Sequence, residues 1–411
     1  MVAATSRPAR VIIDLGAIER NVKALAQHVA PAALCAVVKA DAYGHGALAV
    51  ARAAVGAGAD WLAVAVVDEG LALRAAGIDV PILLLSEPSP GAMADAQAAW
   101  LTPTLYTRSG IAAASLAARG GLHPWPIHLK VNTGMNRVGA QPDELLELAR
   151  IVVADPMLDL GGVWTHLAVA DDPAAPETDA QLTLYEQVLG SLAEAGIDPG
   201  IRHAANSGGV LAHPRSRYDL VRPGIALYGI APSPDVAGLV ELEPALSLTA
   251  RVSFVKSVSA GERISYGLRH TFDANATVAT VPIGYADGVA RRLGLVGGAV
   301  LIGGRRRPIV GVVTMDQLMV DCGDGDVSVG DEVVLLGRQG DESIGAGEWA
   351  DLLGAIPYEI VCGFGPRLPR ESEPPLAQGP AVGVSVGAGG ARAAGGVPGP
   401  DRSTEISELS P

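Results

Sequence analysis

The sequence predicts an α/β protein: an eight-stranded parallel β/α barrel of the TIM type, followed by an all-β C-terminal domain. Three observations support this fold class. Eight short β-like runs alternate with Ala- and Leu-rich helical stretches, several runs are apolar at consecutive positions, and the pattern changes near Glu243. Continuous apolar runs are typical of parallel strands buried on both faces. An open doubly wound sheet shows the same alternation, but the count of eight favours a closed barrel.

The barrel elements follow one another between residues 10 and 242. A helical segment over 14–25, with Asp14 as its N-cap, precedes the first strand, and we expect it to pack against the second domain. The predicted strands cover residues 34–39, 61–66, 81–86, 101–106, 126–132, 158–166, 201–206 and 219–222. The predicted helices cover 47–57, 68–76, 109–119, 142–153 and 178–195, and Gly77, Gly120 and Gly196 stand where C-caps are expected.

The β domain is predicted over residues 243–370, where short β-like runs are separated by Gly-rich turns. Its predicted strands cover residues 246–256, 277–283, 299–302, 309–313, 318–321 and 331–336. Residues 371–411 contain no aromatic side chain and are crowded with Gly, Ala and Pro, so they bury too little apolar surface to offset the entropy of ordering. We expect this tail to be disordered.

Composition narrows the classes of function. The chain carries 30 Lys and Arg against 44 Asp and Glu, a formal net charge of −14, which argues against binding to nucleic acid. Cys35, Cys322 and Cys362 are widely spaced and lack a metal-ligand pattern, so we expect reduced thiols and no metal site. Residues 1–10 lack the apolar core of a signal peptide, and no run approaches a membrane span. The sequence therefore predicts a cytoplasmic protein that binds no membrane.

One lysine stands out at the end of the first predicted strand. Lys39 closes an apolar run, and a loop with Tyr43, His45 and two glycines follows it. Because lysine is rarely buried without a partner, an amine delivered in this way indicates chemistry, and a Schiff base with pyridoxal phosphate fits best. A lysine solvated just beyond a strand is the alternative.

Polar residues gather at the same ends of other predicted strands, where barrel enzymes build their active sites. They are Lys130 late in strand five with Arg137 in the next loop, His166 closing strand six, Asn206 and Ser207 closing strand seven, and Arg222 closing strand eight. The loops after strands seven and eight commonly hold a phosphate in this fold, and here they carry Gly208, Gly209 and Gly224. Either loop alone could be a simple glycine turn; together, opposite Lys39, they favour a phosphate site.

At these positions the chain resembles the bacterial alanine racemases. The matching runs are AVVKADAYGHG (36–46), KVNTGMNRVG (130–139), THLA (165–168), NS (206–207), RPGIALYG (222–229), SYG (265–267), IGYADG (283–288), TMD (314–316) and PYE (357–359). They occur in family order between about residues 10 and 370. The resemblance implies a homodimer with shared active sites that interconverts L- and D-alanine by a two-base mechanism on a pyridoxal 5'-phosphate aldimine, supplying D-alanine for peptidoglycan.

The resemblance also implies residue roles. Lys39 is the Schiff-base lysine and one acid/base, and Tyr266 of the partner subunit is the other. The cofactor-binding set is Tyr43, His166, Asn206, Ser207, Arg222, Gly224, Ile225 and Tyr358, with Arg222 at the pyridine nitrogen. The substrate-binding set is Arg137, the Met315 backbone and Tyr285, which lines the access route. Lys130 matches a position where a lysine can be carbamylated; an unmodified lysine with a hydrogen-bonded neighbour is the alternative.

Three other functions compete with alanine racemisation. An amino-acid decarboxylase of the same plan is disfavoured because a cation, Arg222, stands where many pyridoxal phosphate enzymes place a carboxylate. A racemase of broad specificity stays open, since pocket width is not readable from sequence. A non-catalytic pyridoxal phosphate carrier would need Lys39 and the phosphate loops, but neither Tyr266 nor the β domain.

Overall fold

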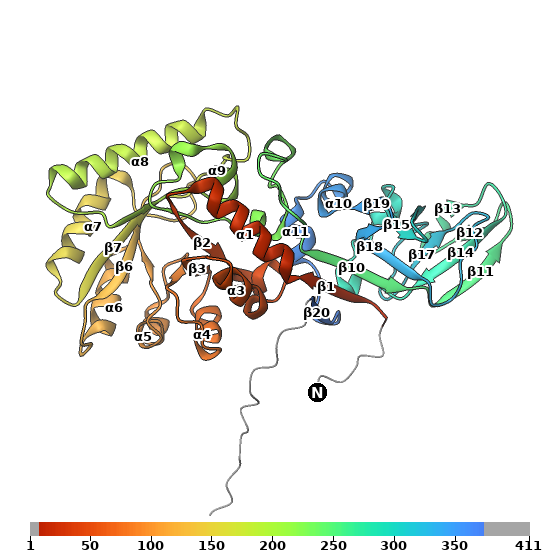
Figure 1. Ribbon diagram of the computed structural model, residues 1–411, viewed down its shortest axis with the longest axis horizontal. Helices are drawn as coiled ribbons and strands as arrows, with labels where there is room; N and C mark the ends of the chain where they lie inside the picture. Colours follow the sequence, from red (N-terminus) through yellow and green to blue (C-terminus); the bar gives the residue numbers. More distant parts are fainter. Residues whose placement is uncertain (1–7, 374–411) are drawn as a thin grey trace, which may run out of the picture. The chain divides into compact units, whose positions relative to one another are not determined.

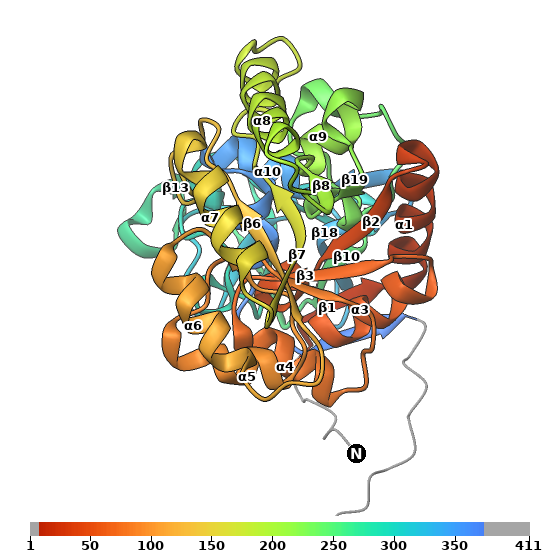
Figure 2. The same ribbon diagram turned by 90° about the vertical axis from the view of Figure 1, so that its left-hand side faces the viewer.

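The computed structural model of the protein describes residues 8–373, which form a β/α barrel and a β domain (Figure 1). Figure 2 shows the barrel strands surrounded by helices. No helix within residues 8–373 is long and apolar enough to cross a membrane.

Eight parallel strands form the barrel, as predicted. They are β2 (Ala33–Val37), β3 (Trp61–Val64), β4 (Ile82–Leu84), β5 (Thr104–Leu105), β6 (Trp125–Lys130), β7 (Leu158–Trp164), β8 (Ile201–His203) and β9 (Leu220–Val221). They pair in the orders β4-β3-β2-β9 and β5-β6-β7-β8. A parallel bridge between Leu83 and Thr102 joins the two sheets on one side, and the Asp219 N–H donates to the Arg202 carbonyl on the other at 3.0 Å. The sheet therefore closes, and the open doubly wound alternative is excluded.

Helices cover the outside of the barrel. They are α1 (Leu15–Val29), α3 (Ala47–Gly56), α4 (Val67–Ala75), α5 (Met93–Ala98), α6 (Arg108–Ala118), α7 (Pro142–Ala154), α8 (Glu177–Glu194) and α9 (Ser207–Ala212). Asp14 caps α1 as predicted, since its carboxylate accepts from the Ala17 N–H at 2.9 Å. Gly77, Gly120 and Gly196 follow helix ends with φ of 81°, 89° and 70°, a left-handed conformation that glycine adopts without strain. Helix α5 was not predicted, because its six residues are too few to show a helical period.

The N-terminal segment divides between the two parts of the molecule. Strand β1 (Arg10–Asp14) joins the β domain, where it pairs antiparallel with β10 (Leu246–Arg251) and parallel with β20 (Arg370–Glu373). Helix α1 instead packs mainly on the barrel, against α3. It meets the second domain only at its first turns, where Arg20 pairs with Glu243 at 2.7 Å. The expectation that the N-terminal segment packs on the β domain is therefore correct for β1 and wrong for most of α1.

The β domain is built from a larger sheet that is antiparallel except for the parallel β1–β20 pair, a smaller antiparallel sheet and a short hairpin. Besides β10 and β20, its strands are β11 (Phe254–Val258), β12 (Arg263–Ile264), β13 (His270–Thr271), β14 (Ala276–Val281), β15 (Ala299–Ile302), β16 (Arg305–Pro308), β17 (Leu318–Asp321), β18 (Glu332–Gln339) and β19 (Glu342–Ile344). The larger sheet has the order β16-β15-β18-β10-β1-β20, with β19 paired to β18, and the smaller has the order β11-β14-β17. Helices α10 (Ala346–Leu353) and α11 (Pro357–Cys362) complete the domain.

Three predictions in this domain need correction. The single strand expected over 246–256 is two strands, since β10 pairs with β1 and β18 while β11 pairs with β14 in the other sheet. The prediction of a strand over 309–313 is wrong, because only Ile309 forms a β-bridge, to Val320. The apolar residues of this stretch are buried, but apart from Ile309 they do not pair with a neighbouring strand. Strand β20 extends to Glu373, beyond the predicted start of the tail at residue 371. The remainder of that predicted tail, 374–411, lies outside the described residues.

Candidate active site

Lys39 lies two residues beyond the end of β2 and begins a turn of unusual conformation. This turn, α2 (Lys39–Tyr43), has φ of 53°, 53°, 54° and 54° at Ala40, Asp41, Ala42 and Tyr43, so four successive L-residues are left-handed. Each such residue costs roughly 1–2 kcal/mol relative to the right-handed form. A turn of this kind persists only where its surroundings hold it. Strain is therefore concentrated between Lys39 and Tyr43, two of the predicted site residues.

Two groups hold the turn from outside. Glu69, in the first turn of α4, accepts from the Ala40 N–H at 2.6 Å through one carboxylate oxygen and from the Ala65 N–H at 2.8 Å through the other. Arg370, in β20, donates from Nε to the Gly44 carbonyl at 2.8 Å. A barrel helix and the last strand of the β domain thus fix the turn together.

Tyr43 reaches across to the loops after β8 and β9. A Cβ built on Gly224 would lie 2.5 Å from the Tyr43 hydroxyl, so only glycine permits this approach. The Ser207 hydroxyl accepts from the Gly224 N–H at 2.9 Å. Ile225 opens a 3₁₀ turn, Ile225–Tyr228, so its N–H has no partner within that turn. Tyr358, from α11, brings its ring within 6.0 Å of the Tyr43 ring. The structure therefore brings together five residues of the predicted cofactor-binding set, which would hold the phosphate: Tyr43, Ser207, Gly224, Ile225 and Tyr358.

Arg222 is buried and donates to neutral groups. It hydrogen-bonds Nδ1 of His203 at 2.8 Å, the Thr165 carbonyl at 2.9 Å and, more weakly, Nδ1 of His166 at 3.4 Å. Within residues 8–373 no carboxylate forms an ion pair with Arg222, so no barrel carboxylate neutralises its charge. Burial lowers the pKa of Arg222 to about 10, so the guanidinium stays charged at neutral pH. Burial, followed by the charge of Arg222, holds the pKa of His166 well below its usual value.

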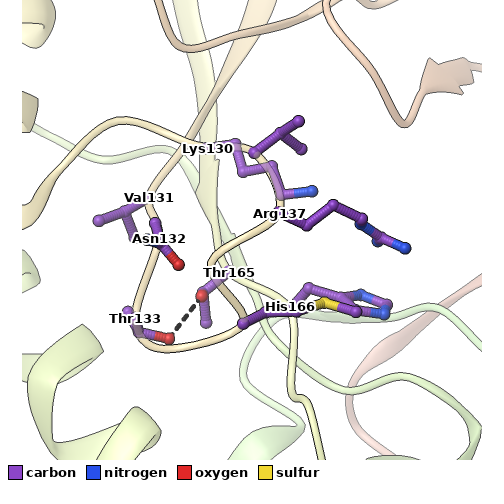
Figure 3. A pocket seen from close by; sticks show the side chains of 9 residues that line it. Lys130, Val131, Asn132, Thr133, Arg137, Thr165 and His166 are labelled. Atoms are coloured by element: carbon purple, nitrogen blue, oxygen red, sulfur yellow. Dashed lines mark hydrogen bonds between the residues drawn. The ribbon is translucent and has the colours of Figure 1, made fainter.

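A small pocket beside Arg222 is lined by Lys130, Thr133, Met135, Arg137 and His166 among others (Figure 3). Lys130 and Arg137 extend to the same side of this pocket as His166 (Figure 3). Lys130 Nζ lies 4.1 Å above the centroid of the Trp164 ring. Burial, and then the charges of Arg222, Arg137 and Lys39, lowers the pKa of Lys130 to about 7. Burial and Arg137 likewise lower the pKa of Lys39. A pocket that gathers cations without a carboxylate in its lining is suited to anionic groups.

Asn206 has a different role from the other predicted cofactor residues. Its Oδ1 caps the short helix α9 by accepting from the Gly209 N–H at 3.0 Å, and its Nδ2 donates to the Leu167 carbonyl at 3.1 Å. Both ends of the amide are used, so Asn206 holds the loop that presents Ser207.

Three predicted site residues of the β domain have exposed side chains. The exposed fractions are 72% for Tyr266, 42% for Tyr285 and 52% for Met315. The Tyr285 N–H donates to the Thr314 carbonyl at 2.9 Å, which places the loops of Tyr285 and Met315 side by side. Within residues 8–373, no hydrogen bond or ion pair joins these three side chains to the barrel site. Tyr266 lies between β12 and β13 of the β domain.

The sequence analysis missed residues that support this site. His203 faces inward at the end of β8 and contacts Arg222, and its polar character within a buried strand was the one available signal. Glu69 lies in the predicted helix 68–76. Gln181 lies in the predicted helix 178–195, and its amide contacts Thr133 and the backbone of His166 and Ala168, which a helical pattern does not indicate. These contacts join segments far apart in the sequence, so local patterns do not indicate them.

Comparisons with known proteins agree with this geometry. The alanine racemase N-terminal domain family matches residues 13–232, and the alanine racemase C-terminal domain family matches residues 245–372. The alanine racemase of Symbiobacterium thermophilum is 50% identical over 367 residues, which cover 89% of this chain and 97% of the relative.

Solved structures of amino-acid racemases resemble the chain over most of its length. The alanine racemase of Streptomyces lavendulae superposes with a TM-score of 0.84 at 39% identity, covering 90% of this chain and 97% of that one. A histidine racemase from Leuconostoc mesenteroides superposes with a TM-score of 0.82 at 31% identity, covering 90% and 99%. The chain therefore belongs to the alanine racemase family, whose members are pyridoxal phosphate-dependent amino-acid racemases.

Proposed function

We propose that this protein interconverts L- and D-alanine and uses pyridoxal 5'-phosphate as its cofactor. One observation carries the proposal. Lys39 and Tyr43 lie on one strained turn, and the Tyr43 hydroxyl meets the loop where Ser207 accepts from the Gly224 N–H. An amine for a Schiff base and a cradle for a phosphate are thereby presented on one face of the barrel.

The residues present fit the cofactor. Its phosphate would be held by the Ser207 hydroxyl, the N–H groups of Gly224 and Ile225, and the hydroxyls of Tyr43 and Tyr358. The missing Cβ at Gly224 leaves room for an oxyanion near backbone N–H groups, since a side chain there would meet the Tyr43 hydroxyl at 2.5 Å. The cations of the neighbouring pocket add a field that favours both a phosphate and a substrate carboxylate.

Bound there, pyridoxal phosphate would supply an electron-withdrawing ring that acidifies the Cα–H of an amino acid. Arg222 would face the pyridine nitrogen with neutral His166 beside it. Because Arg222 keeps its charge, with a pKa of about 10, protonation of that nitrogen is disfavoured. The weaker electron sink that results suits proton removal and return better than decarboxylation.

Two acid/base groups on opposite faces of Cα would exchange the proton. We assign them to the Lys39 amine and to the hydroxyl of Tyr266 of the partner subunit. Burial and the Arg137 charge lower the pKa of Lys39, which increases the fraction of neutral amine able to accept a proton. Arg137 and the backbone of the partner's Met315 would hold the substrate carboxylate, and the partner's Tyr285 would line the access route.

A homodimer follows from the same assignment. Tyr266 is 72% exposed, and no contact within residues 8–373 joins it to the barrel site of its own subunit. An acid/base catalyst has to reach within hydrogen-bonding distance of the proton that it transfers. We therefore propose that the β domain of one subunit completes the barrel site of the other, and that residues 10–242 and 243–370 are the two domains.

Lys130 is the candidate for carbamylation. An amine with a pKa of about 7 is substantially neutral near physiological pH, as attack on carbon dioxide requires. The product is an anion, and it would lie among the charges of Arg137, Arg222 and Lys39, which lower the pKa of the unmodified amine. Carbamylation would therefore relieve repulsion between cations and orient Arg137 toward a substrate carboxylate.

In the cell, we place this activity in the cytoplasm, where D-alanine would be supplied for peptidoglycan. The similarity to a histidine racemase favours a second candidate, a racemase of broader specificity. The two differ in the amino acids that they accept, so one experiment separates them.

The test is racemisation of L-alanine by the purified protein with added pyridoxal phosphate, beside L-serine, L-lysine and L-histidine. A Lys39→Ala variant is the control. D-alanine formation that the variant loses is the expected result, and equal rates on the other amino acids would favour the broader racemase. Cofactor binding without racemisation of any substrate would overturn the proposal and indicate a pyridoxal phosphate carrier.

A further inference from the structure

The loop that carries Arg137 is organised from within. Oδ1 of Asn132 accepts from the Asn136 N–H at 2.9 Å, and Nδ2 of Asn132 donates to Oδ1 of Asn136 at 2.9 Å. The Asn132 N–H donates to the Ala140 carbonyl at 2.9 Å, which closes the loop at its base. These bonds fix the shape of the loop, so the position of Arg137 relative to the rest of the site depends on the contacts that join the loop to its neighbours.

One of these contacts passes through Thr133, which is 5% exposed. Its hydroxyl lies 2.7 Å from the hydroxyl of Thr165, at the end of β7, as the dashed line in Figure 3 marks. It also accepts from Nε2 of Gln181 at 3.3 Å. Because Gln181 donates to it, the Thr133 hydroxyl is free to donate its own hydrogen to Thr165.

Gln181 is a buried amide of helix α8, only 4% exposed. Besides its bond to Thr133, Nε2 donates to the His166 carbonyl at 3.1 Å, and Oε1 accepts from the Ala168 N–H at 2.9 Å. The two backbone contacts require opposite ends of the amide, so they fix its orientation. A Cβ on Gly134 would lie 3.3 Å from Cγ of Gln181, which shows that the stem of this side chain packs on the Arg137 loop as well.

One side chain therefore joins two functional segments: the loop of Arg137 and the segment from His166 to Ala168. The first would bind the substrate carboxylate and the second adjoins Arg222 at the cofactor ring. Gln181 belongs to helix α8, which contributes no group to the site. It joins the two segments through its side chain alone.

We propose that Gln181 is a positioning residue, which sets the place of Arg137 relative to the cofactor ring by clamping these two segments together. This inference rests on the proposed function, because it concerns the site for the substrate carboxylate. A residue with this role acts mainly on carboxylate binding, because Gln181 itself does not contact Ser207 or Gly224. The segment that it holds meets the phosphate loop through the Leu167 carbonyl, which accepts from Nδ2 of Asn206 at 3.1 Å.

The experiment compares Gln181→Met with Gln187→Met in the holoenzyme. Methionine keeps the length of the side chain and removes all three hydrogen bonds, and Gln187 is an exposed residue of the same helix. Propionate is the probe, because it carries the carboxylate of alanine and no amine. We expect Gln181→Met to weaken propionate binding, measured by calorimetry, and to raise KM for alanine about tenfold with a smaller change in kcat, as loss of uniform binding does. Pyridoxal phosphate affinity should stay within about twofold, and Gln187→Met should match the wild type.

Thr133→Val provides a second variant that keeps the side-chain shape. We expect it to weaken propionate binding in the same direction. The double variant should lose less than the sum of the two single losses, because the Gln181–Thr133 bond is common to both substitutions. Unchanged propionate affinity in either folded variant would overturn the proposal, even if the melting temperature fell, because only a structural role would remain. A wild type that binds propionate but racemises no amino acid would instead count against the proposed function.

Discussion

The Arg222 guanidinium donates to Nδ1 of His203 at 2.8 Å, and this contact fixes the protonation of two buried histidines. A guanidinium can only donate, so Nδ1 of His203 accepts and the proton of that ring is on Nε2. Nε2 lies 2.9 Å from Nδ1 of His128, which must accept in turn. Burial, assisted by the Arg222 charge, lowers the pKa of His128 to about 3 and that of His203 well below its usual value. Both rings are therefore neutral: His203 accepts from Arg222, and His128 accepts from His203.

Replacing His203 by Phe should destabilise the protein. The ring of His203 stacks on Trp164 with centroids 5.4 Å apart, and phenylalanine preserves that packing while removing the acceptor for Arg222. A buried donor left without a partner costs about 1–3 kcal/mol, more for a charged group. Urea unfolding measures the effect, with His123→Phe at an exposed loop position as the control. Equal free energies of unfolding in the two variants would show that Arg222 does not depend on His203.

A methyl group at Gly224 should impair cofactor binding. The added Cβ would lie 2.5 Å from the Tyr43 hydroxyl, and the Tyr43 ring cannot retreat freely because it packs 5.1 Å from the ring of Tyr228. We expect Gly224→Ala to weaken pyridoxal phosphate binding about tenfold or more, measured by fluorescence titration. Gly190→Ala is the matched control, since nothing lies within 4 Å of a Cβ there. That substitution, within helix α8, should leave cofactor affinity unchanged and stabilise the protein slightly.

Lys130 should make stability depend on pH in a defined direction. Its pKa is lowered from 10.5 to about 7 in the folded protein, so between these values the unfolded chain binds more protons. The cost of burying the charged amine is complete below pH 7 and disappears as the pH rises toward 10.5. Lys130→Met should therefore have a higher free energy of unfolding than the wild type. The difference should be largest below pH 7 and should shrink as the pH rises toward 10.5. Denaturant titrations in buffer free of carbon dioxide test this, with exposed Lys23→Met as the control.

Carbon dioxide should modify Lys130 and improve substrate binding. Protein equilibrated with ¹³C-bicarbonate should show a carbamate carbon resonance that Lys130→Met lacks. Because the carbamate would orient Arg137, removing carbon dioxide should raise KM for alanine in the wild type but not in the variant. A wild-type spectrum without the resonance would favour the unmodified lysine.

Much of the fold could be predicted because local patterns carry it. Each barrel strand is a short apolar run, and Lys39 was recognisable because a single charge ends such a run. The same criterion failed at residues 309–313, where an apolar stretch is buried without pairing beyond Ile309. Hydropathy records burial, and it does not distinguish a buried loop from a strand.

The supporting contacts of the site could not be predicted in this way. Gln181 acts through Thr133, 48 positions earlier in the chain, and His203 through Arg222, 19 positions later. Their partners are fixed only once the barrel closes, so no spacing along the sequence indicates them. The left-handed turn after Lys39 is also hidden, because Ala40 and Ala42 disfavour this conformation and one aspartate between them does not indicate it.

Tyr266 offers the sharpest test of the shared active site. Its side chain is 72% exposed, so Tyr266→Phe should fold normally while losing one acid/base group. We expect racemisation to fall about 10²–10⁴-fold in both directions. Tyr218→Phe, which loses a surface hydroxyl that contacts Glu186 at 3.2 Å, should leave the rate unchanged. Unchanged rates in Tyr266→Phe would contradict the two-base mechanism.

Mixing two inactive variants then shows whether the site is shared between subunits. A heterodimer of Lys39→Ala and Tyr266→Phe chains has one intact site and one doubly defective site if Tyr266 serves the neighbouring barrel. Random reassociation of equal amounts should therefore restore about a quarter of the wild-type activity, because about half of the dimers are heterodimers. If Tyr266 served its own barrel, every site in the mixture would lack one group, and activity would stay at the level of the separate variants.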